Sequence, residues 1–530
     1  MRVSSRSSAP IALIVALYLA FTSSQNISVS RATAQAAPRL DYTVSVADAA
    51  GHRFHLKIAV SNASGSTLDI TMPAWTPGWY TIKPYAANVL KLQAHDNGKR
   101  LSMRAITKQT YRIDTGGLRG FTIEYDYLAN DLSVNGAELT EKRGYFLGTN
   151  LFFYVAGHTT DVPTTVKFEL PAGWRIASGL KRAAEPNTFA ARNFDNLVDC
   201  PTVLGDFDED TTVVEGKTIH IVVDPKGQLT DEARASLKEM VQRVIGSQSR
   251  MFGGLPYDEY WVLFVGGDNV RTGGALEHEN STNLMVRRMP SDPKFLLGGV
   301  SHEHFHAWNV KRIKPAGLVP YDYSREQYIQ ELWFAEGVTS YYGDMHLMRA
   351  GLTTSEQFVQ QQSGQITGLQ NNEARRWISV DDASTTTWLT YTGGGPFTVN
   401  YYNKGQVLGF LLDLEIRGAT NGRKSLDDVL RYMFENLYKR GRGYTDDDVE
   451  KAASEIAGRS FKEFFARYIH GTDELDYNAA LTHAGWRLDE TKTDQPNARF
   501  AVQYRIVEIE NATDAQKAVR RGLLSQTSNN

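Results

Sequence analysis

Hydrophobic and polar residues alternate along the first part of the chain. Stretches with a period of two occupy residues 42–46, 54–60, 121–127 and 165–170. Because successive side chains of a strand point to opposite faces, this alternation predicts strands with one buried face. Turn sequences rich in glycine, asparagine and serine separate the stretches. We therefore expect residues 37–212 to form an N-terminal all-β domain.

The pattern changes near residue 213. Strands are predicted at residues 218–223, 260–265 and 283–286, and a helix at residues 231–251. Two helices follow, one within residues 292–314 and one from Ser324 to about residue 350. Ser324 and Gln327 have the spacing of a capping box at the start of the second helix. This order of elements predicts a mixed α+β domain over residues 213–350.

Further helices are predicted after Gly351, a residue suited to ending a helix. They begin near Thr354, Asn403, Ser425, Thr445 and Ser460, and a second capping box is expected from Ser460 and Glu463. Residues 351–485 are thus expected to form a helical domain. The last segment, residues 486–530, is expected to be a tail in which residues 501–510 form one or two strands.

Composition narrows the class of protein. With 530 residues, 42% of them hydrophobic and 22% charged, the chain is long enough for about two to four globular domains. The formal net charge of -3 gives no reason to expect nucleic acid or a membrane surface as a partner. The single cysteine, Cys200, excludes an internal disulfide and is expected to be a buried, unreactive thiol. The composition does not indicate an oligomeric state.

The N-terminal segment is typical of a secretory signal peptide. Arg2 and Arg6 precede a short apolar stretch at residues 9–21, and small residues suited to cleavage follow at residues 32–36. The stretch is short for a bilayer span, and an uncleaved N-terminal anchor is the alternative. We expect residues 1–36 to direct export, either to the periplasm or out of the cell.

An aromatic segment interrupts the predicted β domain. Residues 73–80 read Pro-Ala-Trp-Thr-Pro-Gly-Trp-Tyr, so prolines and tryptophans together make a rigid loop. Either this loop packs as a corner on the hydrophobic core, or it lines a pocket. The sequence leaves both interpretations open.

The strongest indication of chemistry is an H-E-x-x-H motif formed by His302, Glu303 and His306. Residues four apart lie on one face of a helix, so both imidazoles can reach one zinc ion at about 2.0–2.1 Å. Glu303 lies beside them and can take a proton from the water that such an ion activates. His304 cannot share that face and is expected to have a packing role.

Two glutamates of the next predicted helix compete as the third zinc ligand. Two histidines and one carboxylate leave the fourth position to water, as a catalytic zinc ion requires. Glu331 and Glu336 are five residues apart and therefore face different sides of one helix. The sequence around Glu336 is the more apolar, and a buried carboxylate needs a metal ion or another partner. Local chemistry thus favours Glu336 modestly.

Two longer stretches resemble a known family. Residues 302–315, HEHFHAWNVKRIKP, and residues 333–342, WFAEGVTSYY, resemble the glycyl aminopeptidase family of zinc metallopeptidases. This family belongs to the gluzincins and is related to the aminopeptidase N and leukotriene hydrolase family. The similarity extends from about residue 40 to about residue 485. It implies a thermolysin-like catalytic domain with one zinc ion per chain, held by His302, His306 and Glu336.

A third element is similar to the Y-x-K-G sequence of these aminopeptidases. It comprises residues 402–405, YNKG. In the family the tyrosine donates a hydrogen bond that stabilises the oxyanion, which a phenol can do without carrying a charge of its own. The resemblance implies that Tyr402 is catalytic, with Tyr401 as the alternative donor.

A fourth element, residues 273–278 (GGALEH), is similar to the family's G-x-M-E-N sequence. That sequence runs along the substrate, and its glutamate binds the free α-amine. The resemblance implies that Gly274, Ala275 and Glu277 bind substrate, whereas His278 stands where the larger family has asparagine. The alternative is that Glu277 only caps a strand or pairs with a neighbouring arginine, Arg271 or Arg287.

One feature of most family members is not visible in the sequence. They carry a PDZ domain after the helices, whereas here about 45 residues follow Trp486 and contain no G-L-G-F-like loop. The sequence therefore predicts that this domain is absent or truncated. Recognition of peptide tails by such a domain is not expected.

Together these features predict an exported zinc aminopeptidase that hydrolyses the N-terminal bond of peptides. The resemblance implies a preference for glycine or alanine at the N-terminus of the substrate. Two alternatives stay open: an endopeptidase with the same metal site, if Glu277 binds no amine, and an inactive exported binding protein. Neither nucleic acid nor a stable membrane partner is expected.

Overall fold

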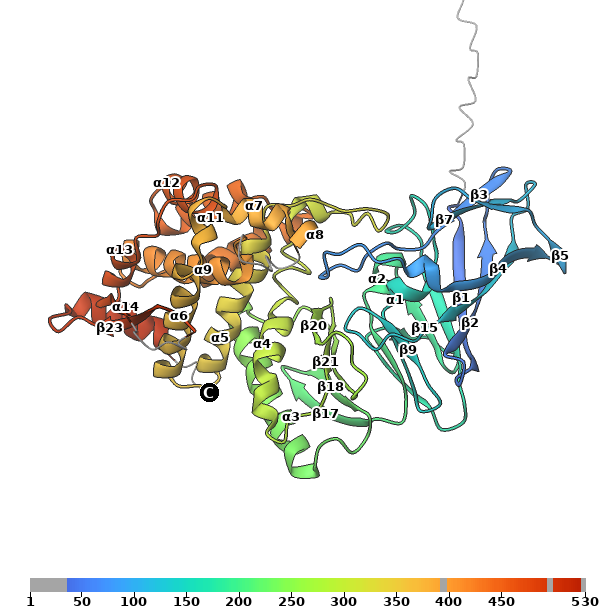
Figure 1. The fold of residues 1–530 in the computed structure, drawn as a ribbon, viewed down its shortest axis with the longest axis horizontal. Coiled ribbons are helices and arrows are strands. Elements are labelled where there is room, and N and C mark those ends of the chain that lie inside the picture. The colour runs from blue at the N-terminus through green and yellow to red at the C-terminus, as the bar shows by residue number, and fades with distance from the viewer. Residues whose placement is uncertain (1–35, 391–397, 493–498, 526–530) are drawn as a thin grey trace, which may run out of the picture. The chain divides into compact units, whose positions relative to one another are not determined.

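The computed structural model describes residues 36–390, 398–492 and 499–525. The predicted signal peptide, residues 1–36, lies outside these ranges except for its last residue. Figure 1 shows strands in the N-terminal part of the chain, strands and helices together in the middle, and mainly helices toward the C-terminus. This order confirms the predicted multidomain α+β fold class. Within the described ranges, no helix is both long and apolar enough to cross a membrane.

The N-terminal domain is built around one large sheet. Its strands are β1 (Arg39–Asp48), β2 (Arg53–Ser61), β4 (Val89–Asp96), β5 (Lys99–Arg100), β8 (Phe121–Leu128), β12 (Thr164–Glu169), β14 (Lys181–Arg182) and β15 (Thr188–Ala191). Their order is β14-β15-β12-β1-β2-β8-β4-β5, with β1 and β12 parallel and β1, β2 and β8 antiparallel. Alternate residues of these three strands, such as Val44, Phe54 and Ile123, are buried. The predicted period of two is therefore present in the structure.

Two smaller sheets complete this domain. They contain β3 (Thr67–Thr71), β6 (Met103–Ala105), β7 (Thr110–Asp114) and β11 (Tyr154–Val155), and β9 (Ala137–Leu139), β10 (Arg143–Phe146), β13 (Arg175–Ser178) and β16 (Thr202–Gly205). Their orders are β11-β3-β7-β6 and β13-β16-β10-β9. Short helical segments lie between the strands: η1 (Tyr85–Asn88), α1 (Gly148–Leu151) and α2 (Phe194–Val198). Cys200 is buried and unpaired, as expected.

The middle domain contains a mixed sheet. Its strands are β17 (Asp208–Val214), β18 (Lys217–Asp224), β19 (Glu259–Gly266), β20 (Gly274–Glu277) and β21 (Ser281–Val286). The order is β17-β18-β19-β21-β20, with β18, β19 and β21 parallel and both edge strands antiparallel. β17 begins before residue 213, where the domain boundary was expected. The predicted element of residues 273–278 thus forms an edge strand, β20.

Both faces of this sheet are covered. On one face, α3 (Asp231–Phe252) and α4 (Leu297–Phe305) pack against Val262 and Phe264 of β19. Leu263 and Val265 alternate with them and pack against Val134 and Tyr145 of the N-terminal domain. A strand buried on both faces has a continuous apolar sequence, which explains the hydrophobic run of β19.

The helices around the H-E-x-x-H motif differ from the prediction. The turn η2 (Pro293–Leu296) precedes α4, which ends at Phe305 instead of near residue 314. The prediction of a helix from Ser324 is wrong: residues 324–330 are not helical, and the next helix begins as a π-helix, η4 (Trp333–Val338), and continues as α5 (Thr339–Arg349). The side chain of Gln327 donates to the carbonyls of Gly317 and Pro320 and so caps no helix.

The remaining helices form a helical region. They are α6 (Ser355–Gln370), α7 (Val380–Thr385), α8 (Thr387–Thr390), α9 (Tyr401–Ala419), α10 (Leu426–Asn436), α11 (Asp446–Ala457), α12 (Lys462–Phe464), the π-helix η7 (Phe465–Ile469) and α13 (Tyr477–Thr482), with short turns η3 (Ala316–Leu318), η5 (Glu373–Arg376) and η6 (Tyr438–Arg440). In this region α9 packs against α6, α7, α10, α11 and α13. Thr354, Ser425 and Thr445 are N-cap residues, as predicted. The capping box predicted at Ser460 is wrong, because Phe461 precedes the first residue of α12.

The C-terminal segment folds onto the helices. It forms β22 (Trp486–Lys492), β23 (Val502–Glu508) and α14 (Asp514–Leu524). The strand predicted within residues 501–510 is present as β23. The backbone amides of Tyr504 and Ile506 in β23 donate to the hydroxyls of Thr367 and Ser363 on α6. These bonds attach the β22–β23 pair to the helical region.

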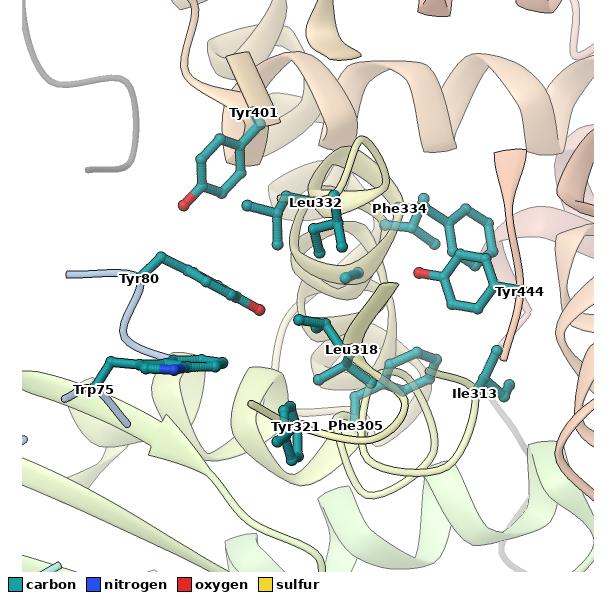
Figure 2. Close-up of a cluster of buried hydrophobic side chains, with 14 of the residues drawn as sticks. Trp75, Tyr80, Phe305, Ile313, Leu318, Tyr321, Leu332, Phe334, Tyr401 and Tyr444 are labelled. Carbon is teal, nitrogen blue, oxygen red and sulfur yellow. The ribbon is translucent and has the colours of Figure 1, made fainter. Parts of the chain in front are cut away.

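The aromatic segment at residues 73–80 packs into a buried cluster. Figure 2 shows Trp75 and Tyr80 of this segment beside Tyr321. The Trp75 ring is fully buried, is stacked at 6.2 Å on Tyr80 and contacts Trp388 edge-on at 5.1 Å. Its indole Nε1 donates to the carbonyl of Asp322. Trp75 and Tyr80 are therefore packed as a corner on the core, and they join the N-terminal domain to the segment between α4 and η4.

Candidate metal centre and active site

The two histidines of the motif point at each other. His302 lies in α4 and His306 at its C-terminal end, and their Nε2 atoms are 3.0 Å apart. The same two atoms are 3.4 Å and 3.2 Å from Oε2 of Glu336, which lies in η4. A tetrahedral zinc ion with bonds of about 2.0–2.1 Å separates its ligand atoms by about 3.3 Å. The three donor atoms therefore have the spacing that one zinc ion requires.

Hydrogen bonds to the second nitrogen fix both imidazole rings. Nδ1 of His306 lies 2.6 Å from the carbonyl of Asn309, which can only accept, so Nδ1 carries the hydrogen. Nδ1 of His302 lies 3.3 Å from the hydroxyl of Ser340, which already donates to the carbonyl of Glu336. Both rings consequently present the Nε2 lone pair to the common point, as metal-binding histidines do.

Three buried carboxylates surround this point. Glu277, Glu303 and Glu336 are 3%, 8% and 2% exposed, and a donor atom of Glu277, one of Glu303 and one of His306 lie within 4.8 Å of one another. Burial raises the pKa of Glu303 well above its usual range, and the negative charges of Glu277 and Glu336 add to the effect. Buried carboxylates are costly without a counter-charge. A divalent cation at the histidines would supply that charge, so the residues present fit a metal ion.

Glu331 lies away from the histidines. Its carboxylate accepts a hydrogen bond from the backbone amide of Gln330, and it belongs to no metal-binding group among the described residues. Glu336, in contrast, lies within the π-helical turns. Single π-helical turns inside longer helices often occur at functional sites.

Two glycines explain how this π-helix meets the helix that carries Tyr402. A Cβ atom on Gly405 of α9 would lie 2.9 Å from the Cα of Gly337, and a Cβ on Gly337 would lie 2.8 Å from the amide nitrogen of Gln406. Any larger residue at either position would therefore force the helices apart. The glycines after Glu336 and after Lys404 thus allow the close crossing that brings α9 to the metal-binding residues.

The structure distinguishes the two tyrosines at the start of α9. The ring of Tyr402 is half-buried, and its centroid lies 6.0 Å from that of His302. Tyr401 is fully buried, and its hydroxyl lies 3.0 Å from the hydroxyl of Thr387. Tyr402 is accordingly the tyrosine adjacent to His302, one of the candidate metal ligands.

Glu277 ends the edge strand β20. Gly274 and Ala275 lie earlier on this strand and are the more accessible, whereas Leu276 and Glu277 are buried. Among the described residues, no ion pair joins Glu277 to Arg271 or Arg287, so the alternative of an arginine partner is not what the structure shows. Burial raises the pKa of Glu277, while His306 and the buried Lys311 oppose this shift.

Two further histidines have structural partners. His278 points away from the cluster of carboxylates and lies 3.3 Å from Asp199 and 2.9 Å from the side-chain oxygen of Asn283. His304 is buried between Tyr257 and Gln248 and lies within hydrogen-bonding distance of both. Burial lowers the pKa of His304 to about 3, which keeps this imidazole neutral. The packing role expected for His304 agrees with these contacts.

Lys311 and Gly78 had no predicted role of their own, yet both lie at the site. The ammonium of Lys311 is 2.6 Å from Asp199 and is the cation whose charge acts on Glu277. Gly78 lies in the aromatic segment and abuts the carboxylate of Glu277. Lys311 lies five residues after His306, whereas Gly78 belongs to the N-terminal domain, and in both cases only the folded chain shows the relation to Glu277.

A second cluster of similar composition lies on other elements. Asp381 of α7, Asp446 of α11 and His470 each offer a donor atom within 4.8 Å of the others. Nδ1 of His470 is 2.5 Å from Asp381, and Asp446 accepts a hydrogen bond from the indole of Trp333. Here the histidine is already paired with a carboxylate.

Two family models match the chain. The model of the peptidase M61 N-terminal domain matches residues 41–206, and that of the M61 glycyl aminopeptidase matches residues 296–408. Together they span more than half of the chain. The chain belongs to the M61 glycyl aminopeptidase family. It is therefore a metallopeptidase, and the resemblance predicted from the motifs is confirmed.

Solved structures with the same fold are known. An aminopeptidase N family protein from Idiomarina loihiensis matches this M61 peptidase with a TM-score of 0.80 and 25% identity, covering 87% of this chain and 80% of that chain. Yeast LTA4 hydrolase in complex with bestatin matches with a TM-score of 0.50 and 13% identity, covering 83% and 67%. The second likeness is one of fold alone. No curated protein sequence matches the chain.

Proposed function

We propose that this M61 peptidase is a zinc aminopeptidase that removes the N-terminal residue of peptides. The observation that carries the proposal is the convergence of His302, His306 and Glu336 on one point with Glu303 and Glu277 buried beside it. One zinc ion per chain would be held by the two Nε2 atoms and the Glu336 carboxylate. When bound, zinc supplies Lewis acidity, which polarises a carbonyl and lowers the pKa of water.

Glu303 has the position of a general base. Its carboxylate lies close to His306, takes a proton from the attacking water and then delivers it to the leaving amine. Tyr402 donates a hydrogen bond to the carbonyl oxygen as negative charge develops there. Because the phenol is neutral, it stabilises the oxyanion without repelling the approach of a cationic substrate.

Glu277 is proposed to select the exopeptidase reaction. Its buried carboxylate pairs with the free α-amine of the substrate, while the accessible part of β20 at Gly274 and Ala275 binds the peptide backbone as an added strand. Pairing at the amine places the first peptide bond, and no later one, at the metal. A preference for a small N-terminal residue, glycine or alanine, is proposed from the family.

Residues 1–36 are proposed to export the protein, since their sequence has the three parts of a signal peptide. An endopeptidase with the same metal centre is the competing function. It is the simpler interpretation only if Glu277 makes no contact with a substrate amine.

One peptide with and without an N-terminal acetyl group separates the two functions. Breaking a buried ion pair on one side costs about 3–5 kcal/mol, or roughly two to four decades in rate. The acetylated peptide should therefore be cleaved that much more slowly by the wild type. In Glu277→Ala most of this gap should disappear, because the free-amine substrate is harmed. Equal cleavage of both peptides by the wild type would identify an endopeptidase.

A further inference from the structure

The N-terminal domain touches the carboxylate that is proposed to bind the substrate amine. Gly78, in the aromatic segment, has a φ of +88°. A Cβ atom at this position would lie 2.6 Å and 2.8 Å from the two carboxylate oxygens of Glu277. Carbon and oxygen atoms that are not bonded do not approach so closely. The Glu277 carboxylate thus fills the space that a side chain at residue 78 would need.

The loop that carries Gly78 is held firmly in place. The backbone amide of Trp79 donates to the carbonyl of Thr76, and the Thr76 hydroxyl lies 2.5 Å from that of Thr149 and 3.0 Å from that of Tyr85. Trp75, in the same aromatic segment, is fully buried (Figure 2). Close-packed surroundings of this kind do not yield easily, so the carboxylate, and not the loop, would have to move.

Glu277 is also confined on its other sides. Its backbone pairs with Thr282 of β21, and donor atoms of Glu303 and His306 lie within 4.8 Å of its carboxylate. The ring of Trp79 extends along the start of the same strand, where it lies 4.0 Å from the position of a Cβ on Gly274. The loop therefore lies against both the start of β20 and its terminal carboxylate.

We propose that Gly78 is a positioning residue for amine recognition: its bare backbone holds the Glu277 carboxylate in the orientation that pairs with the substrate's α-amine. This inference rests on the proposed aminopeptidase function. It makes the N-terminal domain a part of the specificity site, and it explains why the rigid turn carries glycine at the point of contact. A side chain at residue 78 would displace the carboxylate without touching the metal-binding residues.

The test compares Gly78→Ala with Gly173→Ala. Gly173 has a φ of +84°, belongs to the same domain and would have no atom within 4 Å of a Cβ. Both variants place alanine at a positive φ, which strains the backbone, but only the methyl group at residue 78 would contact Glu277. Gly78→Ala should lower kcat/KM for a free-amine peptide about 10²-fold, the effect of a displacement of about 1 Å, and should leave cleavage of the acetylated peptide and the zinc content unchanged. Gly173→Ala should match the wild type in its cleavage of the free-amine peptide, its cleavage of the acetylated peptide and its zinc content.

A compensating substitution adds a result, regained activity, that a folding defect alone cannot produce. Aspartate is one methylene shorter than glutamate, so Gly78→Ala combined with Glu277→Asp makes room for the added methyl group. The double variant should cleave the free-amine peptide faster than Gly78→Ala alone, even though Glu277→Asp by itself is slower than the wild type. A double variant no better than Gly78→Ala, whether through lost folding or lost turnover, overturns the positioning role.

The outcomes also separate this inference from the proposed function. If the wild type cleaves free and acetylated peptides alike, both fail, because Glu277 then binds no amine. If the wild type discriminates but Gly78→Ala discriminates equally well, the aminopeptidase function stands and only the role of Gly78 is overturned.

Discussion

Two clusters in this protein combine histidine with carboxylates, yet their donor atoms are arranged differently. At the metal centre, His302 and His306 turn their Nε2 lone pairs toward each other and toward Glu336. In the second cluster the single histidine, His470, is 43% exposed, and its Nδ1 already lies 2.5 Å from the carboxylate of Asp381. The indole of Trp333 occupies one oxygen of Asp446. Residue type alone therefore does not identify a metal site.

The balance of charge also differs between the two clusters. Around His306, three buried carboxylates converge, and the nearby ammonium of Lys311 is bound to Asp199. Beside Asp381, in contrast, burial raises the pKa of the carboxyl, and the imidazole of His470 and the ammonium of Lys404 both act against that rise. Buried carboxylates whose nearest ammonium already pairs with another carboxylate, as Lys311 does with Asp199, leave more negative charge for a metal ion to balance.

The largest expected effect is the loss of the metal itself. The purified protein should contain about one zinc ion per chain, and His306→Ala should remove both the zinc and nearly all activity, because two donors and water hold the ion poorly. Asp381→Asn in the second cluster should retain both the zinc ion and the activity. Zinc measured by elemental analysis, with and without a chelator, checks this. A chelated, zinc-free protein that still cleaves peptides would refute the metal centre.

The second prediction concerns the two glutamates near η4. Glu336→Ala should weaken zinc binding strongly, whereas Glu331→Ala should not, because Glu331 accepts a hydrogen bond from the backbone and lies outside the cluster. The measurement is zinc affinity by competition with a chelator. Equal affinities in the two variants would contradict the assignment of Glu336.

The third prediction separates metal binding from proton transfer. Glu303→Gln should retain zinc and lose turnover by about 10²-fold or more, because an amide cannot act as the general base. Single-turnover kinetics beside metal analysis of the same sample check it. Normal turnover in this variant would show that another group accepts the proton.

The smallest effect is expected in the second cluster. Burial raises the pKa of Asp446 well above its usual range. The folded protein therefore binds this proton more tightly than the unfolded chain, so stability falls as pH rises above the usual pKa of an aspartate. Asp446→Asn keeps an acceptor for Trp333 without a charge, and should raise the melting temperature by about 2 °C at pH 7. The increase in melting temperature should become smaller toward pH 4, where the aspartate of the unfolded chain is also protonated.

Thermal melts at several pH values check this last prediction. The zinc content of Asp446→Asn should stay at about one ion per chain. A variant that loses metal, or one that is destabilised at pH 7, would indicate that the second cluster binds a cation and would remove the contrast between the two sites.

Local patterns were sufficient for much of the secondary structure. The alternation in residues 54–60 reflects a strand buried on one face, and the hydroxyls of Thr354 and Thr445 cap helices by accepting hydrogen bonds from backbone amides nearby. The hydroxyl of Ser425 donates to Asp428 instead. No helix begins at Ser324, because a serine side chain can also form hydrogen bonds within a turn. Here the Ser324 hydroxyl donates to the carboxylate of Asp322. Capping patterns are local, and only the tertiary contacts decide which local partner is used.

The sequence alone was enough to predict a metal site at His302, Glu303 and His306, because residues four apart in a helix share a face. What surrounds that helix depends on the tertiary structure. The π-helical turns place Glu336, the contact between Gly337 and Gly405 brings Tyr402 to the histidines, and Gly78 meets Glu277 from a different domain. These contacts join residues far apart in the chain, where close packing and not periodicity sets the distance.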